Sequence, residues 1–546
     1  MWKAESPDAK QCALQASCRS GNLERAQWIV KKFVLTAADA RADDNYALRL
    51  ACTNGHLPEA QWLASTFDLT AEDAKAGDNW ALRQSCANGH LPVAQWLVET
   101  FDLTAADAKG DDNYMLRVVC AKGHIEVAKW FVQTFALTAD DARARDNEAL
   151  RLACCEHGRL PVARWLHTTF GLKAADARAN NNYALRRSCL YGHLPVAQWL
   201  RETFALTAVD ARADDNYALR WACTRGHLPV AQWLVETFAL TAADARTDNN
   251  WALREACVNG HLSVAKWLVE TFGLKAADAR VNDNCALRWV CTRGHLSVAK
   301  WLVETFALTA DDARAGNNYA LRRSCEYGHL PVAKWLASMF ELTTIDAIAD
   351  DNYALRRSCL NNHLSVAQWL VATFRIDATD ARADGNYALR EACAKGHLSV
   401  AQWLVETFAL TADDARADDN YALRQSCAKG HLSVAQWLVD TLALTADDAR
   451  ARDNEALLLA CANGHLPVAK WLVESGGLTA EDARDGNNGA LRWACANGHL
   501  EVAQCLQETF KLEAEDARAD NNWALHNARL NGHTAVVEWL RATFGV

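Results

Sequence analysis

The chain has 546 residues, of which 51% are hydrophobic, and a formal net charge of −10 at pH 7. The apolar content is sufficient for a continuous core, whereas the acidic balance argues against general binding to nucleic acids or anionic membranes. No stretch approaches the ~18 apolar residues of a membrane span, and Met1–Gln11 has no apolar run typical of a secretory signal, so we expect a cytoplasmic or nuclear protein.

The sequence Asp-Asn-Tyr-Ala-Leu-Arg at residues 44–49 returns, with small changes, every 34 residues. Copies begin at Asp44, Asp78, Asp112 and Asp146, and after one inserted residue they continue from Asn181 to Asn521. A cruder copy begins at Lys10, which makes sixteen repeat units. A fixed period of this length is typical of stacked supersecondary units. We predict a single domain over residues 1–546, with an N-terminal capping unit at 1–43 and a C-terminal capping unit at 521–546.

The repeat at residues 44–77 predicts three helices. The first should span about residues 45–53, because Leu48, Cys52 and the small residues between them form one inward stripe at helical spacing. Gly55 should then end this helix in the left-handed conformation, which glycine adopts without strain.

The second helix should begin near Pro58 and reads Val-Ala-Gln/Lys-Trp-Leu-Val-Glu-Thr-Phe in most copies. It is apolar on most sides, so we expect the helix and its repeated Trp inside the stack. A short third helix should follow, because Thr70 and Asp73 have the spacing of a capping box. An Asn such as Asn45 stands near the start of each repeat. Its side chain should form a hydrogen bond with a neighbouring backbone group along one edge of the stack.

Nineteen cysteines are present, and fifteen of them occupy one position of the repeat. A small, weakly polar residue at the same place in each repeat indicates a buried, reduced thiol and not a disulfide framework. Cys52 and His56 lie four residues apart, but two ligands per repeat fall short of the about four that zinc takes. We therefore expect no metal and no cofactor, and we assign the His to a hydrogen bond in its turn.

A repeated arginine, such as Arg49, could form a row that binds phosphate. The alternative is that it pairs with acids such as Asp73 or Asp107 and covers apolar surface with its stem. No Gly-rich phosphate loop and no Ser/His/Asp arrangement stands out, and a catalytic site is normally unique, not repeated. We predict that the protein is not an enzyme.

Residues 78–111 include Ala81-Leu82, Ser85-Cys86, Asn88-Gly89-His90-Leu91, Val93-Ala94 and Trp96-Leu97. This pattern resembles the ankyrin repeat and recurs through nearly the whole chain. The resemblance implies a curved helical stack that binds proteins through its concave side. The chain departs from the family where Tyr-Ala-Leu-Arg replaces Thr-Pro-Leu-His, and where Leu-Thr-Ala-Xaa-Asp-Ala-Arg replaces the β-hairpin segment. The predicted fold is therefore an all-α, ankyrin-like helical solenoid, a curved stack of helix-turn-helix units with a short third helix in place of the hairpin.

Three positions of the first helix vary most among the copies, those of Leu50, Thr53 and Asn54 in the second repeat. Their spacing places them on one helix face, opposite the inward stripe, so we expect this face to stay exposed. Trp, Tyr and Arg, which are enriched at interface hot spots, gather there in the middle of the chain. The candidate partner-binding residues, named the variable strip, are Arg187, Tyr191, Trp221, Arg225, Trp289, Arg293, Arg323, Tyr327 and Arg357.

These observations favour a non-enzymatic scaffold or adaptor that binds a protein partner through the concave face of a monomeric array. One alternative is nucleic-acid binding through the same strip, because aromatic rings stack on bases and Arg contacts phosphate. Another alternative is a mechanical spacer, which requires no particular residues on the strip.

Overall fold

The computed structural model of the protein describes residues 7–155, 157–474 and 477–546. These residues form 44 helices and no strand, so the predicted all-α fold with a short third helix in place of the hairpin is confirmed. The chain divides into two compact units, Met1–Asp278 and Ala279–Val546. Sixteen repeats in one domain, with capping units at both ends, stay a prediction, and residues 1–6 of the N-terminal capping unit lie outside the described residues.

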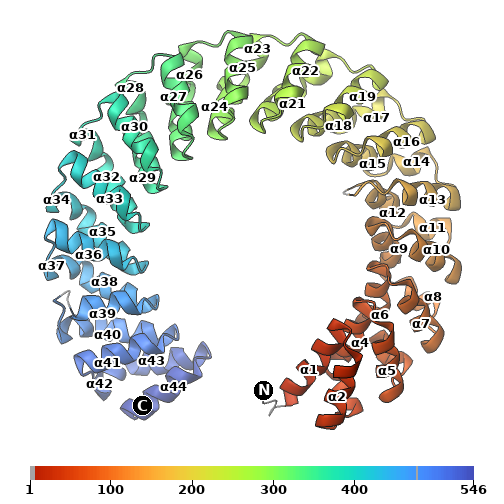
Figure 1. Cartoon of the computed structure of the whole chain (residues 1–546), viewed down its shortest axis with the longest axis horizontal. Coiled ribbons are helices and arrows are strands. Elements are labelled where there is room, and N and C mark those ends of the chain that lie inside the picture. The colour runs from red at the N-terminus through yellow and green to blue at the C-terminus, as the bar shows by residue number, and fades with distance from the viewer. Residues whose placement is uncertain (1–6, 156, 475–476) are drawn as a thin grey trace. The chain divides into compact units, whose positions relative to one another are not determined.

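The first compact unit contains α1 to α22 (Figure 1). Its first helices are α1 (Pro7–Ser20), α4 (Ala42–Thr53), α6 (Ala71–Ala87), α9 (Gly110–Lys122), α12 (Ala144–Cys154), α15 (Ala179–Leu190), α18 (Ala213–Thr224) and α21 (Thr247–Val258). Its second helices are α2 (Leu23–Phe33), α5 (Leu57–Thr66), α7 (Leu91–Phe101), α10 (Ile125–Thr134), α13 (Leu160–Phe170), α16 (Leu194–Phe204), α19 (Leu228–Phe238) and α22 (Leu262–Phe272). The short helices are α3 (Ala37–Ala40), α8 (Ala105–Ala108), α11 (Ala139–Ala142), α14 (Ala174–Ala177), α17 (Ala208–Ala211) and α20 (Ala242–Ala245).

The second compact unit has the same three sets, and α23 (Ala276–Ala279) precedes them. The first helices are α24 (Val281–Thr292), α26 (Ala310–Glu326), α29 (Ala349–Leu360), α32 (Ala383–Ala394), α35 (Ala417–Ala428), α38 (Ala451–Ala462), α40 (Ala480–Ala496) and α43 (Ala519–Leu530). The second helices are α25 (Leu296–Phe306), α27 (Leu330–Met339), α30 (Leu364–Phe374), α33 (Leu398–Phe408), α36 (Leu432–Leu442), α39 (Leu466–Glu474), α41 (Leu500–Phe510) and α44 (Thr534–Phe544). The short helices are α28 (Thr344–Ala347), α31 (Ala378–Ala381), α34 (Ala412–Ala415), α37 (Ala446–Ala449) and α42 (Ala514–Ala517).

Within each compact unit the first helices lie in one layer and the second helices lie in another (Figure 1). The core lies between these layers, where Leu48, Cys52 and Leu63 are buried. All fifteen equivalent cysteines are buried, as predicted, and burial raises the pKa of the Cys86 thiol to about 12.

The repeated Trp of the second helix is half-buried or exposed in every described copy except Trp199, which is 8% exposed, so its predicted place inside the stack is wrong for most repeats. Trp28 is 55% exposed and Trp301 is half-buried. The indole of Trp301 meets the ring of Phe306 edge to face, with 6.0 Å between the ring centroids. The helix instead buries Val298, Ala299 and Leu302 against the first layer, so the indole of Trp301 is left on its outward side.

Each repeat after the first begins with a left-handed turn that the sequence pattern did not reveal. Asp43, Asp44 and Asn45 have φ values of 54°, 55° and 58°, a conformation that Asp and Asn tolerate better than most residues. The side chain of Asn45 donates to Oδ1 of Asp73 at 3.2 Å, in the same repeat. The equivalent Asn352 also donates to the backbone carbonyl of Asp380 at 3.1 Å, so the predicted backbone bond occurs at one repeat and a carboxylate takes its place at Asn45. The regular first helix therefore starts only after the turn.

Candidate protein-binding surface

In most repeats, an arginine pairs with an aspartate of the next repeat and so joins the two. Nε and Nη2 of Arg41 donate to the two carboxylate oxygens of Asp73 at 2.8 and 2.9 Å. The same carboxylate accepts the backbone N–H of Thr70 at 2.8 Å, which closes the predicted capping box. Burial alone raises the pKa of Asp73, but the bonds from Arg41, Thr70 and Asn45 outweigh it and lower the pKa to about 2. One aspartate thus caps its own short helix and holds the preceding repeat.

Equivalent pairs recur along both compact units. In the first unit they are Lys75–Asp107, Lys109–Asp141, Arg143–Asp176, Arg178–Asp210, Arg212–Asp244 and Arg246–Asp278. In the second unit they are Arg280–Asp312, Arg314–Asp346, Arg382–Asp414, Arg416–Asp448, Arg450–Asp482 and Arg484–Asp516.

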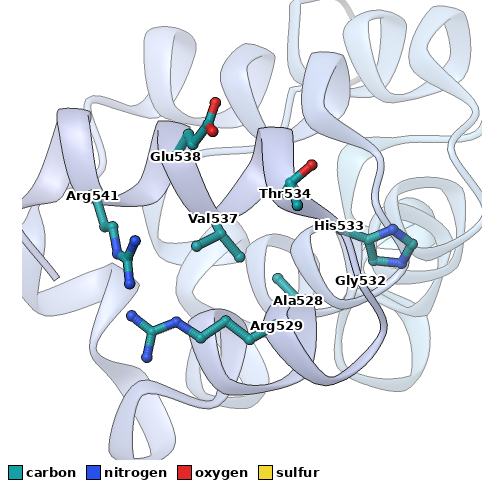
Figure 2. A pocket seen from close by; sticks show the side chains of 8 residues that line it. All are labelled: Ala528, Arg529, Gly532, His533, Thr534, Val537, Glu538 and Arg541. Carbon is teal, nitrogen blue, oxygen red and sulfur yellow. The ribbon is translucent and has the colours of Figure 1, made fainter. Parts of the chain in front are cut away.

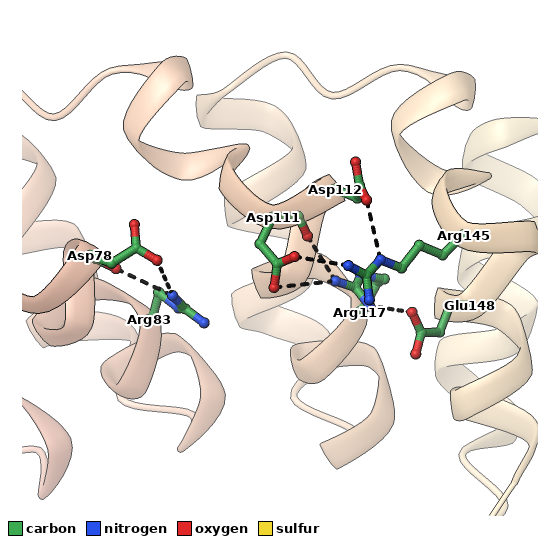
Figure 3. A network of polar contacts seen from close by, with 7 residues as sticks. All are labelled: Asp78, Arg83, Asp111, Asp112, Arg117, Arg145 and Glu148. Carbon is green, nitrogen blue, oxygen red and sulfur yellow. Dashed lines mark hydrogen bonds and ion pairs between the residues drawn. The ribbon is translucent and has the colours of Figure 1, made fainter.

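The other arginine row, which includes Arg49, binds the left-handed turns. Figure 3 shows Arg83 donating to the Asp78 carboxylate at 2.6 Å, and Arg117 donating to the carbonyl of Asp111 at 2.8 Å and to Glu148. The predicted pairing of this row with Asp73 or Asp107 is therefore wrong, because those two carboxylates bind Arg41 and Lys75. Most of the charge on this row is neutralised inside the protein, which weakens its case as a phosphate-binding surface.

The repeated His also connects repeats, and its predicted bond within its own turn is wrong. Nε2 of His56 donates to the carbonyl of Arg19 at 3.1 Å, in the preceding repeat. Gly55, with φ of 79°, has the predicted left-handed conformation, and a Cβ there would lie 2.5 Å from the ring of His90. The glycine is thus required both for its φ and for the close approach of the next imidazole.

In the first compact unit, Arg187 and Tyr191 of the variable strip lie at the end of α15, and Trp221 and Arg225 lie at the end of α18. Arg225 is exposed and the other three are half-buried. Arg187 donates to the hydroxyl of Tyr191 at 3.0 Å and to that of Tyr217 at 3.4 Å. The indole of Trp221 lies between the rings of Tyr217 and Trp251, with centroid distances of 5.6 and 6.0 Å. The four residues therefore share one surface over adjacent helices.

In the second compact unit, Trp289 is 38% and Tyr327 is 49% exposed, and Arg293 is also exposed. The half-buried Arg323 and Arg357 both approach the carboxylate of Glu326, which itself is 7% exposed. The hydroxyl of Tyr353 also donates to Glu326, at 2.8 Å.

Sequence reasoning missed Glu326 as the acid that holds these two strip arginines. The available signal was its position, since Glu326 is the one acidic residue where the other repeats have mainly small or apolar side chains.

The variable face is narrower than predicted. The position of Thr53 is buried in most repeats of this region, as in Leu190, Thr224 and Thr292, because it faces the neighbouring repeat. Nε1 of Trp251, in the next repeat, donates to Oγ1 of Thr224 at 3.1 Å. Only the positions of Leu50 and Asn54 therefore supply the strip's surface side chains.

At the position of Asn54, an asparagine commonly contributes to stacking. Asn88 donates to the carbonyl of Thr53 at 2.8 Å, in the preceding repeat. The same bond recurs at Asn361, Asn463, Asn497 and Asn531. Arg225 and Arg293 stand in this position without any side-chain hydrogen bond or ion pair to another described residue. These substitutions give up a bond between repeats and gain an exposed guanidinium.

Other kinds of site find little support in the described part of the chain. A pocket of about 300 Å³ is lined by Arg529, Gly532, Arg541 and five other residues (Figure 2). It is an end face of the stack. The imidazole of His533 covers Gly498 of the preceding repeat, whereas a Cβ at the equivalent Gly532 would have no atom within 4 Å. Among the residues described, no three His, Cys, Asp or Glu side chains are grouped to hold a metal ion. No helix formed by these residues is long and apolar enough to cross a membrane.

The model of the ankyrin repeat family, in three copies, matches residues 185–283, 253–346, 321–414, 353–446 and 457–545. These matches cover more than half of the chain, so the protein belongs to the ankyrin repeat family. Ankyrin repeats are generally non-enzymatic protein-interaction scaffolds. A search of curated proteins finds no match.

Two solved structures are similar to this chain. One is an ankyrin repeat family protein from Legionella pneumophila, with 16% identity and a TM-score of 0.24 over 60% of this chain and 82% of that one. The other is the pentatricopeptide repeat protein PPR10 from maize, with 12% identity and a TM-score of 0.26 over 99% of this chain and 90% of that one.

Proposed function

We propose that the protein is a scaffold that binds a partner protein through the variable strip, with one contact surface on each compact unit. The observation that carries this proposal is the replacement of a stacking asparagine by Arg225 and Arg293, beside the partly exposed indoles of Trp221 and Trp289. A stack that served only as a spacer gains nothing from these residues. Arg and Trp offer large contact areas and several hydrogen bonds, which are typical of interface hot spots.

Nucleic acid fits this surface less well than a protein does. The repeated arginine row, which would supply a continuous track of phosphate contacts, is largely occupied by aspartates of the left-handed turns. The chain as a whole carries a net charge of −10, which repels a polyanion.

The experiment has two stages. A photo-crosslinking amino acid placed at Arg225 should capture a protein partner from the native source, and one placed at Lys266 on α22 should not. The affinity of the captured partner is then measured for the double variant Trp221→Gln/Trp289→Gln. Glutamine stands at the same position in other repeats, in Gln84 and Gln425, so the variant should retain the fold.

We expect the double variant to bind at least about tenfold more weakly, because two hot-spot side chains are lost, and to retain its melting temperature. Unchanged affinity would reject the strip as the binding surface. A fall in the melting temperature by many degrees would instead assign the two indoles to the core.

A further inference from the structure

No carboxylate of the described residues forms an ion pair with Arg187. Arg323, at the same position four repeats later, has Glu326 three residues further along, and the two side chains form an ion pair. The residue three positions after Arg187 is Leu190, which is buried. The described contacts of the Arg187 guanidinium are the hydroxyls and rings of tyrosines, and none of them is a carboxylate.

The environment of Arg187 favours an incoming anion. The side chain is half-buried. A guanidinium that has lost part of its hydration gains more from a carboxylate than a fully solvated one does. Arg225, on the neighbouring helix α18, provides a second positive charge with no described ion pair.

The surface around these two charges is apolar and aromatic. The rings of Tyr217, Trp221 and Trp251 follow one another at centroid distances of 5.6 and 6.0 Å. Such rings provide contact area for an aliphatic or aromatic side chain at low entropic cost.

We infer that the surface formed by Arg187, Tyr217, Trp221 and Arg225 binds an acidic segment of the partner protein, in which carboxylates accompany an apolar side chain. This inference rests on the proposed function and narrows the class of partner. Neither arginine pairs with a described carboxylate, and both lie in a chain whose net charge is −10, so the positive charge is local and suits a short acidic segment. An extended polyanion would also meet the carboxylates of Asp214 and Asp248, which lie in the left-handed turns at the starts of α18 and α21.

The test is a selection of random dodecapeptides displayed on phage against the full-length chain. The test variant is Arg187→Gln/Arg225→Asn, because other repeats have Gln84 and Asn54 at these positions. The control variant, Arg164→Gln/Lys266→Gln, also removes two positive charges, from exposed sites on α13 and α22 where other repeats have Gln61 and Gln95. Circular dichroism of both variants verifies that the helical content is retained.

We expect the selected peptides to combine Asp or Glu with aromatic or aliphatic residues. Their affinity, measured by fluorescence polarisation, should fall at least about tenfold in the test variant and with rising salt, and should change little in the control variant. Selected peptides without acids, an equal loss in both variants, or no peptide that depends on Arg187 would each overturn the inference. Tighter binding of an oligothymidylate than of the peptides, lost in the test variant alone, would assign the surface to nucleic acid instead.

The result also separates this inference from the proposed function. Neutral peptides that lose affinity in Trp221→Gln but not in the arginine variant would retain the strip as a protein-binding surface and reject only the acidic partner. Peptides that bind equally well to both variants and to Trp221→Gln would count against both proposals.

Discussion

Two successive connections between repeats in the second compact unit differ in the residue that faces the aspartate. Arg314 donates to both carboxylate oxygens of Asp346 at 2.8 and 3.1 Å, and Asp346 is 5% exposed. One repeat later, Ile348 stands where the arginine is expected, and Asp380 is only half-buried. The arginine therefore does more than neutralise the carboxylate, because its side chain also shields it from water.

The capping of the short helix survives this loss. Asp380 still accepts the backbone N–H of Asp377, at 3.2 Å, compared with 2.8 Å for the equivalent bond from Thr343 to Asp346. Asp377 adds bonds of its own from the N–H groups of Thr379 and Asp380, at 2.8 and 3.0 Å. The comparison shows that one aspartate combines a local cap with a connection between repeats, and that the two roles are separable.

The same two repeats differ at the turn after the first helix. Gly328 has φ of 76°, and a Cβ there would lie 2.6 Å from Nδ1 of His363. In the following repeat Asn362 has φ of 63°, and Nε2 of His397 nevertheless donates to the carbonyl of Leu360 at 3.0 Å. The histidine bond therefore tolerates asparagine at one turn, whereas the glycine turn leaves no room for a side chain.

Acidification should have the largest effect, because it acts on many connections together. Burial alone raises the pKa of Asp346, but bonds from Arg314 and Thr343 lower it on balance. Stability from this group is thus complete above the unfolded pKa of about 3.9 and is lost as the pH falls below it. Hydrogen exchange should show α28 better protected than α31 near neutral pH and equally protected at about pH 2. A difference that persists in acid would mean that the arginine acts by packing alone.

Protonation of the histidines should also weaken the stack, and it should do so at a higher pH than protonation of the aspartates. Burial lowers the pKa of His363 and of His397. Their contribution is complete above the unfolded pKa of about 6.5 and decreases as the pH falls through that value, because the unfolded chain then binds more protons. A thermal melt at pH 7 and at pH 5 should show the loss, and replacement of His397 by Gln should reduce the difference between the two. An identical pH dependence in that variant would contradict the assignment.

Gly328→Ala should be the most damaging single substitution in this pair of repeats. A side chain in the left-handed region costs about 1–2 kcal/mol, and the displaced imidazole of His363 adds to this cost. Local hydrogen exchange around α26 and α27 measures the effect. Asn362→Ala is the matched variant. It should cost less, because Asn362 already has a side chain in the left-handed conformation. Equal costs would contradict the requirement for space at Gly328.

Asp346→Ala should cost about 1–2 kcal/mol, because it removes a helix cap and leaves Arg314 without its carboxylate. Asp380→Ala should cost less, since Asp377 retains part of the cap and no arginine loses its partner. Protection factors of α28 and α31 in the two variants make the comparison. Equal effects would show that the cap, and not the connection between repeats, accounts for the stability.

Ile348→Arg should have the smallest effect and the opposite sign. It supplies the missing arginine opposite Asp380 and should stabilise this connection by about 0.2–1 kcal/mol, the range for partly exposed ion pairs. The variant should slow exchange in α31 at neutral pH, and high salt should reduce the gain. Ile348→Gln is the control, since it removes the apolar side chain without adding a charge.

The candidate surface was only partly predictable from the sequence. Arg225, Trp289 and Tyr327 are exposed as the helix spacing suggested, because their positions face away from the inward stripe. Glu326 was missed although its pair with Arg323 lies within one helix, at i,i+3. Its contacts with Arg357 and Tyr353 depend on how two neighbouring helices are offset, and one helix read alone does not contain that offset. Whether these residues bind a partner stays a prediction.

The sequence by itself determined the repeat, the three helices, the left-handed glycine and the buried cysteine, because each depends on contacts within about one repeat. Tertiary structure alone decided which partners the repeated arginines and histidines take. Arg41 binds Asp73 and the Arg49 row binds the turns, and His56 reaches back to Arg19. The partners of Arg41 and His56 lie in adjacent repeats, and each repeat offers several acids and carbonyls at similar sequence distances. The choice among them follows from the rotation and offset of one repeat on the next, which only the stacked structure specifies.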